Sequence, residues 1–182
     1  MTAGSAATER EDLARALTEA AVLRGHFVLR SGAVSDYYID KYRLTTKPAL
    51  LARLTAALVP LLPEDAQRIA GPALGAVPLA TALSLASGLP ALFVRVDSPK
   101  DHGTGKVIEG LLDAGDRVVI VEDIVTSGGA SAAAVAALRA AGAEVIGVVA
   151  VVDREQGGPQ ALAAIDVPFR ALFTRTELGL GG

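Results

Sequence analysis

Two adjacent carboxylates followed by a glycine turn are the part of this sequence best suited to chemistry. Glu122 and Asp123 follow four apolar residues, and a Thr-Ser-Gly-Gly turn begins two residues later, at residues 126–129. Glycines let backbone N–H groups converge without obstruction from a Cβ atom, and such a turn before a helix favours a bound phosphate. Neighbouring carboxylates suit hydroxyl groups, or a metal ion, on the same ligand. A sugar phosphate with hydroxyl groups would use both halves.

The same residue types also have an ordinary structural explanation. Ser, Thr, Asp and Gly often precede helices, because they cap the first N–H groups. The best-known competing phosphate signatures are absent, since the sequence contains neither GxxxxGK[ST] nor GxGxxG. Two acids at the end of a buried strand are costly without a compensating role, which favours a ligand site.

The elements that would position this motif follow a repeated strand–loop–helix pattern. Apolar runs predict strands, and intervening Ala- and Leu-rich runs predict helices. The expected strands are 68–71, 89–96, 116–123, 144–154 and 169–175, and the expected helices between them are 77–88 and 131–143. This order predicts an α/β fold with a mainly parallel central sheet flanked by helices, whose strands deliver their carboxyl ends to one edge.

A smaller N-terminal part precedes the sheet. Residues 1–7 are small and mostly polar, which predicts disorder, and Thr8 and Glu11 have the spacing of a capping box. A helix over 10–24 and a hairpin of two short strands, over 26–32 and 35–44, are expected to form an N-terminal hood over about residues 8–45. A further helix is expected to begin at Pro48.

A second feature is a polar segment inside the sheet domain. Residues 97–107 contain glycines and no apolar periodicity, which predicts a mobile loop within about residues 96–110.

Composition narrows the class of protein. A chain of 182 residues that is 51% hydrophobic suits one domain, and a net charge of −3 argues against a general nucleic-acid or membrane-surface binder. The lack of Cys excludes disulfides, thiolate metal sites and Cys nucleophiles. No apolar run approaches the roughly 20 residues of a membrane span, and the N-terminus does not resemble a secretory signal. The expectation is a single cytoplasmic domain over residues 1–182.

Residues 118–130, VVIVEDIVTSGGA, resemble the phosphoribosyl-pyrophosphate signature of the type I phosphoribosyltransferases. That pattern has four apolar residues, two acids, two apolar residues, Thr, a small residue, Gly and two further small residues. The resemblance implies that the two acids hold the ribose hydroxyls of 5-phosphoribosyl 1-diphosphate and that the turn holds its 5-phosphate. The implied donor-binding residues are Arg95, Lys100, His102, Glu122, Asp123, Ile124, Val125, Thr126, Ser127, Gly128, Gly129 and Ala130.

Further segments resemble the orotate phosphoribosyltransferases within that family, in the family's order. They are FVLRSG at 27–32, SDYYID at 35–40, GPALGAVP at 71–78, KDHGTG at 100–105 with Glu109-Gly110 following, and Asp153-Arg154. The resemblance implies orotate binding by Arg30, Tyr38, Thr126 and Arg154, and catalytic roles for Lys100, His102 and Asp123. It also implies Mg²⁺ as cofactor, with Glu122 and Asp123 as candidate ligands, directly or through water. A homodimer is implied too, with the loop shared between subunits.

The chain departs from this pattern at two basic positions. Gly75 stands where many members have Lys, and Val96 follows Arg95 where a second Lys is usual. Lys41, in the hood, is expected to be solvated. Two other functions remain open, namely transfer to another base such as a purine and a non-catalytic effector-binding regulator. An arginine pair, Arg30 and Arg154, favours an anionic acceptor, whereas a regulator would usually need a DNA-binding domain or a basic surface.

Overall fold

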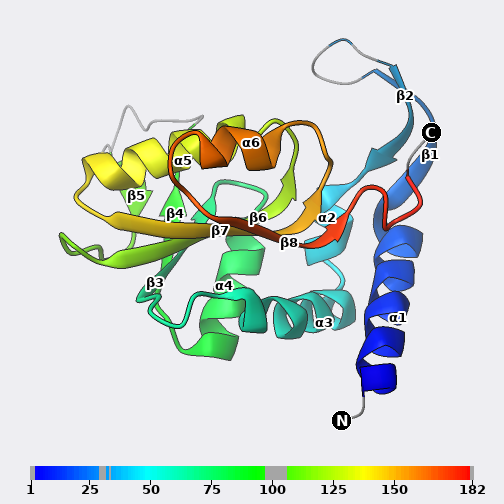
Figure 1. The fold of residues 1–182 in the computed structure, drawn as a ribbon, viewed down its shortest axis with the longest axis horizontal. Helices are drawn as coiled ribbons and strands as arrows, with labels where there is room; N and C mark the ends of the chain where they lie inside the picture. The colour runs from blue at the N-terminus through cyan, green and yellow to red at the C-terminus, as the bar shows by residue number, and fades with distance from the viewer. Residues whose placement is uncertain (1–2, 29–31, 33, 97–105, 181–182) are drawn as a thin grey trace.

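A six-stranded sheet forms the centre of the computed structural model, which describes residues 3–28, 32, 34–96 and 106–180 of the chain (Figure 1). The strand order is β5-β4-β3-β6-β7-β8, and only the edge strand β5 runs antiparallel to its neighbour. This arrangement confirms the predicted α/β class. The strands are β3 (Arg68–Pro72), β4 (Ala91–Val94), β5 (Ile108–Glu109), β6 (Arg117–Val125), β7 (Glu144–Asp153) and β8 (Phe169–Thr174).

Helices cover both faces of this sheet (Figure 1). On one face lie α5 (Gly129–Ala140) and α6 (Gly158–Ala163), and on the other lie α3 (Pro48–Leu58), the short 3₁₀ turn η1 (Val59–Leu61) and α4 (Val77–Ser87). The apolar run of β6 explains the arrangement. Val118 and Ile120 pack into the core beneath α5, and Val119 and Val121 pack into the opposite core. Strand β6 is therefore buried on both faces, as its continuous apolar run predicts.

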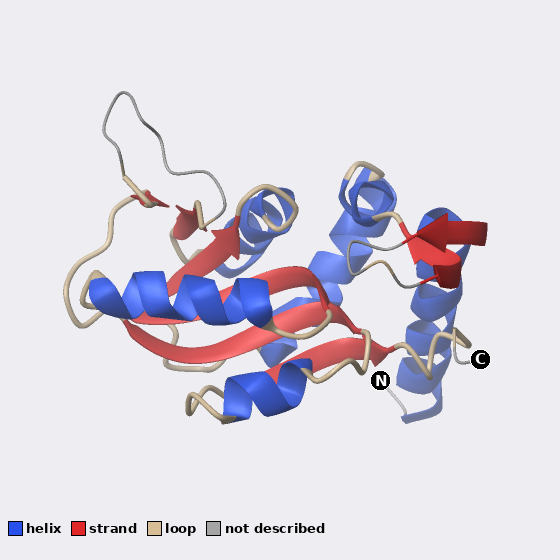
Figure 2. Ribbon diagram, turned by 90° about the horizontal axis from the view of Figure 1, so that it is seen from above, coloured by secondary structure: helices blue, strands red, loops and turns tan. Residues whose placement is uncertain are grey.

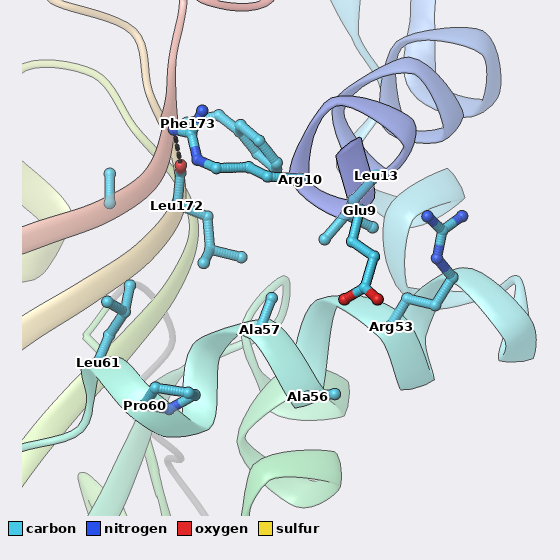
Figure 3. Close-up of a pocket in the computed structure, with 11 residues that line it drawn as sticks. Glu9, Arg10, Leu13, Arg53, Ala56, Ala57, Pro60, Leu61, Leu172 and Phe173 are labelled. Carbon is cyan, nitrogen blue, oxygen red and sulfur yellow. Dashed lines mark hydrogen bonds between the residues drawn. The ribbon is translucent and has the colours of Figure 1, made fainter. Parts of the chain in front are cut away.

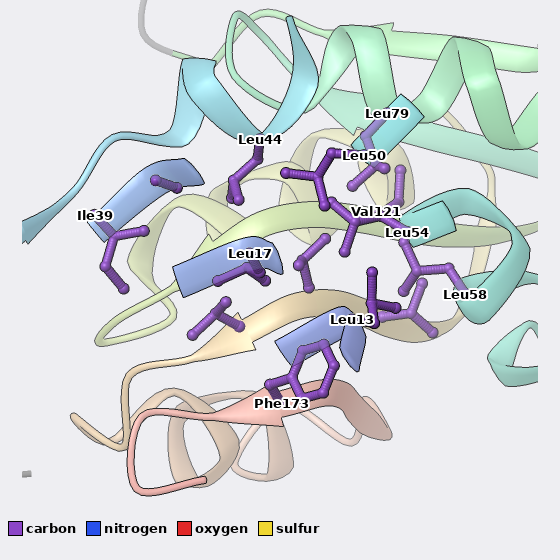
Figure 4. Close-up of a cluster of buried hydrophobic side chains, with 14 of the residues drawn as sticks. Leu13, Leu17, Ile39, Leu44, Leu50, Leu54, Leu58, Leu79, Val121 and Phe173 are labelled. Atoms are coloured by element: carbon purple, nitrogen blue, oxygen red, sulfur yellow. The ribbon is translucent and has the colours of Figure 1, made fainter. Parts of the chain in front are cut away.

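The larger core joins the sheet to the N-terminal part of the chain (Figure 4). Leu13 and Leu17 of α1 (Ala3–Ala21) face Leu54 of α3 and Phe173 of β8, and all four side chains are buried. Their spacing of four residues places both leucines on one helical face, as the sequence predicts.

The expected N-terminal hairpin is present. Strand β1 (Val22–Val28) pairs antiparallel with β2 (Val34–Ile39), and α2 (Lys41–Thr45) follows. Figure 2 shows this hairpin standing beside the end of α1, away from the central strands.

The boundaries of the hood differ from the prediction. Helix α1 begins at Ala3, whereas the sequence predicted a helix from residue 10, and the alanines near the N-terminus favour the longer helix. The second strand ends at Ile39 and not at residue 44, because Asp40 caps α2 by accepting a hydrogen bond from the Tyr42 backbone N–H (3.1 Å).

The predicted mobile loop is shorter than expected at its C-terminal end. The Arg95 backbone N–H donates to the Val107 carbonyl (2.8 Å), and β5 then pairs with β4. Two residues of the expected loop, 108 and 109, therefore belong to the sheet. Residues 97–105 lie outside the described part of the chain.

The order of the strands creates a switch point beside β6. The chain leaves β3 through α4 toward β4 on one side, and it leaves β6 through α5 toward β7 on the other. The loops after β3 and β6 therefore diverge from adjacent strands, and such a crevice is where open α/β sheets bind ligands. In the described ranges, no helix is both long and apolar enough to cross a membrane.

Candidate active site at the β3–β6 switch point

The two acids of the motif lie inside a strand. The predicted strand ended at residue 123, but β6 continues to Val125, and Glu122 pairs with Ala150 of β7. Glu122 and Asp123 are only 6% and 4% exposed. Two adjacent carboxylates are thus held in the sheet, next to the switch point, with little access to water.

Glu122 has one hydrogen-bond partner from the helix that follows the turn. The Ser131 hydroxyl, in the first turn of α5, donates to Glu122 Oε1 (3.0 Å). Burial and the neighbouring Asp123 charge raise the pKa of Glu122 from 4.5 to about 8, although Ser131 and Lys41 oppose the shift. Ser131 was not predicted as a site residue. Its place in the first helical turn, just after the glycines, was the signal that could have suggested it.

Asp123 is less well satisfied. Its Oδ1 accepts from the Ile124 backbone N–H (2.7 Å), but its buried Oδ2 finds no hydrogen-bond donor among the described residues. Burial raises the pKa of Asp123, and the Lys41 charge opposes that rise. The Lys41 ammonium lies 3.9 Å from Oδ2. The expectation that Lys41 is simply solvated is therefore wrong, since its side chain reaches the acid pair.

The glycine turn leaves its polar groups accessible. Thr126, Ser127, Gly129 and Ala130 are exposed, and no side chain in the described structure caps the start of α5. Gly128 has φ 79°, which favours glycine, and a Cβ there would lie 3.1 Å from the Gly158 carbonyl oxygen. An exposed turn at an uncapped helix N-terminus suits a phosphate group.

The loop after β3 closes the other side of the acid pair. Residues 73–76 connect β3 to α4, and Gly75 is buried there. A Cβ atom at Gly75 would overlap Asp123 Oδ2 and lie 2.8 Å from Lys41 Nζ. Glycine at this position is what lets the loop, the carboxylate and the ammonium group meet.

Arg154 and a tyrosine of the hood form the remaining described part of the predicted site. Arg154 immediately follows β7, its backbone N–H donates to the Val125 carbonyl, and its side chain is partly buried. Its Nη2 donates to the Tyr37 hydroxyl (3.2 Å), and its guanidinium carbon lies 5.3 Å from the centre of the Tyr37 ring. Its buried Nε finds no acceptor among the described residues.

The tyrosine beside Arg154 is Tyr37, whereas the sequence resemblance implies that Tyr38 binds orotate. Tyr38 is 41% exposed and packs against Phe27, with ring centroids 5.7 Å apart. Tyr37 is 6% exposed and points to Arg154. Side chains alternate along a strand, so neighbouring tyrosines face opposite sides, and sequence alone does not decide which one faces the site.

Three predicted residues lie outside the described part of the chain, namely Arg30, Lys100 and His102. Arg95 is described and partly buried just after β4, where its backbone joins Val107 at the base of the predicted loop.

The residues also limit how a metal ion could be held. Among the described residues, no group of three or more His, Cys, Asp or Glu side chains could hold a metal ion. The unsatisfied Asp123 Oδ2 could accept from a metal-bound water, provided that a ligand supplied most of the coordination.

A cleft of about 740 Å³ lies elsewhere, between α1, α3 and β8 (Figure 3). Arg10 crosses it and donates to the Leu172 carbonyl (2.8 Å). None of the predicted site residues lines this cleft. The lining residues are Glu9, Arg10, Leu13, Arg53, Ala56, Ala57, Pro60, Leu61, Ala171, Leu172 and Phe173.

Comparisons with known proteins indicate the same family as the motif at residues 118–130. Residues 44–167 match the model of the phosphoribosyl transferase domain family. An orotate phosphoribosyltransferase of Pyrococcus horikoshii is 46% identical over 166 residues, which cover 89% of this chain and 88% of that protein.

Solved structures show the same fold. The orotate phosphoribosyltransferase of Mycobacterium tuberculosis, in complex with 5-phospho-α-D-ribosyl 1-diphosphate, matches with a TM-score of 0.80 and 35% identity. The match covers 94% of this chain and 99% of that one. UMP synthase of Leishmania donovani matches with a TM-score of 0.81 and 35% identity over 92% of this chain, which spans only 37% of that longer chain.

Proposed function

The chain belongs to the phosphoribosyl transferase domain family, and we propose that it transfers the phosphoribosyl group of 5-phosphoribosyl 1-diphosphate to orotate. The products are orotidine 5′-phosphate and diphosphate, in pyrimidine nucleotide synthesis. The observation that carries this proposal is the buried Glu122–Asp123 pair between two divergent loops, together with the similarity to orotate phosphoribosyltransferases over most of the chain.

The donor would lie across the switch point. Its 5-phosphate would bind the exposed turn at residues 126–130, and its ribose hydroxyls would donate to Glu122 and Asp123. Hydroxyl donors would satisfy the carboxylate oxygen that finds none among the described residues. Buried carboxylates with raised pKa values gain from such partners, since an unsatisfied buried acceptor is costly.

Orotate would bind on the Arg154 side. The bond from the ribose C1 to a diphosphate oxygen breaks and its electron pair leaves with diphosphate, while a ring nitrogen of orotate bonds to C1 and gives up its proton to the departing diphosphate or to water. A planar guanidinium suits the orotate carboxylate, and Arg154 has donor capacity left because only Tyr37 is bonded to its side chain among the described residues. The protein's main tasks are to position two anions and to stabilise the departing charge.

Mg²⁺ is proposed as the cofactor. When bound at this site, it would neutralise part of the charge on the leaving group. Glu122 and Asp123 would face it directly or through water, which fits a site with two buried carboxylates and no larger cluster among the described residues.

Two further proposals concern the assembly and its compartment. A cytoplasmic location is proposed because a highly charged phosphorylated donor does not cross membranes and must be used where it is made. A homodimer that shares the loop between subunits follows from the resemblance, and light scattering in solution would test it.

The decisive functional assay follows orotate consumption with the donor and Mg²⁺. Adenine, hypoxanthine and uracil serve as competing acceptors in separate reactions. The proposal is supported if orotate is consumed only when donor and Mg²⁺ are present, and if adenine, hypoxanthine and uracil are not consumed. Consumption of a purine in preference to orotate, or donor binding without any acceptor turnover, would favour one of the two alternatives instead.

A further inference from the structure

Lys41 lies where the sequence pattern lacks a cation. In the family resemblance, many members have Lys at the position of Gly75, and this chain has none there. The space beside Gly75 nevertheless holds an ammonium group, because Lys41 Nζ would be 2.8 Å from a Cβ atom built on Gly75. A side chain at residue 75 and the Lys41 ammonium would therefore compete for the same volume.

The hood places Lys41 there. Strand β2 ends at Ile39, the Asp40 backbone N–H donates to the Ala21 carbonyl (2.8 Å), and Lys41 is the first residue of α2. Asp40 also caps α2 and pairs with Arg43 (3.2 Å). The position of Lys41 is thus fixed by the backbone of a capped helix that contacts the end of α1.

The contact of Lys41 with Asp123 is incomplete. The Nζ–Oδ2 distance of 3.9 Å exceeds hydrogen-bond length, and the Lys41 side chain is 39% exposed. An ammonium group has three N–H donors, and one partly exposed ion pair leaves most of that capacity for an anion. The group lies between a buried carboxylate and the loop at residues 73–76, which precedes the N-terminus of α4.

We propose that Lys41 is a donor-binding residue whose ammonium group contacts the diphosphate of 5-phosphoribosyl 1-diphosphate, in the space that Gly75 leaves open. This inference rests on the proposed function. When the ribose hydroxyls bind the acid pair, the Lys41 ammonium turns from Asp123 to the diphosphate. The cation thus comes from the hood, and the loop after β3 supplies room for it.

Calorimetric binding of inorganic diphosphate and of ribose 5-phosphate tests this role. Lys41→Met keeps most of the side-chain volume and removes the charge. We expect it to weaken diphosphate binding about 10- to 100-fold, the range for loss of one charge-assisted hydrogen bond. Ribose 5-phosphate, which lacks the diphosphate, should bind within about threefold of the wild-type affinity.

Two further variants separate a local role from general damage. Lys47 is exposed at the start of α3, so Lys47→Met should leave both affinities unchanged. Lys41→Arg keeps a cation at residue 41, so diphosphate binding should stay much closer to the wild-type affinity than in Lys41→Met.

The outcomes distinguish this inference from the proposed function. Unchanged diphosphate binding in Lys41→Met overturns the inference, as does an equal loss for both ligands, which would show that Lys41 acts only through the acid pair. Failure of the wild-type chain to bind the complete donor would instead overturn the proposed function, independently of Lys41.

Discussion

Two acids in β6 and two acids near the C-terminal ends of β7 and β8 differ in how they are satisfied. Glu122 and Asp123 are buried with raised pKa values, and one oxygen finds no donor among the described residues. Glu155 accepts from the Thr176 backbone and hydroxyl groups (2.9 and 2.6 Å), and its pKa is lowered mainly by that hydroxyl.

Glu177 shows the same pattern as Glu155. It accepts from Arg10 (2.7 Å) and from the Thr174 backbone N–H (2.8 Å). Burial raises its pKa, but these bonds more than offset that effect, so the net shift is downward. The hydrogen bonds of the two surface acids are satisfied by the protein itself, whereas those of the β6 acids are not. This difference marks the β6 pair as a site for a ligand.

The largest expected effect comes from replacing both buried acids. Glu122→Gln with Asp123→Asn should lower kcat/KM by about 10²- to 10⁴-fold, because two buried carboxyl groups that would accept hydrogen bonds from the ribose hydroxyls are lost. Steady-state kinetics measure this, with circular dichroism to confirm folding and Glu177→Gln as the matched surface control. A loss of less than tenfold in the double variant would remove the distinction between the two acid pairs.

Arg154 extends the comparison to the arginines. Arg154→Ala should raise the orotate KM far more than the donor KM, by roughly 30-fold or more, since truncating one partner of a buried charge pair costs about 2–5 kcal/mol. Arg175→Ala, which removes an arginine at the end of β8 near Glu155, should leave both KM values nearly unchanged. Equal changes in the two KM values for Arg154→Ala would indicate a structural role.

Stability should change with pH in opposite senses at the two sites. The pKa of Glu122 is about 8 in the folded chain against its ordinary 4.5, so the unfolded chain ionises first and stability falls as pH rises from 4.5 to 8. Glu122→Gln should therefore raise Tm at pH 8 and much less at pH 5, measured without donor or Mg²⁺. A lower Tm for this variant at pH 8 would show that the buried charge stabilises the fold.

The smallest effect is expected at the surface. The lowered pKa of Glu177 contributes stability above its unfolded pKa, and that contribution is lost as pH falls. Glu177→Gln should cost less than about 1 kcal/mol at pH 7, because both members of its ion pair with Arg10 are substantially exposed. Denaturant unfolding at pH 7 and at pH 3.5 checks this, and an equal cost at both values would contradict the electrostatic origin.

The sequence predicts the sheet well because its strands are apolar runs between glycine turns. It also predicts the acids and the turn at residues 122–130, because their spacing is local. It does not reveal partners that are distant in sequence, such as Lys41 beside Asp123 or Tyr37 beside Arg154. Those contacts depend on how the hood packs against the sheet domain. Which side of the hairpin each hood residue faces depends on the strand register, and the turn of the hairpin determines that register.

The central claim is that the β6 acids and the turn after them bind the donor. Calorimetric titration of 5-phosphoribosyl 1-diphosphate, without orotate, into the wild-type chain, Glu177→Gln and Glu122→Gln/Asp123→Asn tests it directly. The wild-type chain and the surface variant should bind the donor with equal affinity, and the double variant should bind it at least about 100-fold more weakly. A folded double variant that keeps the wild-type affinity would contradict the account.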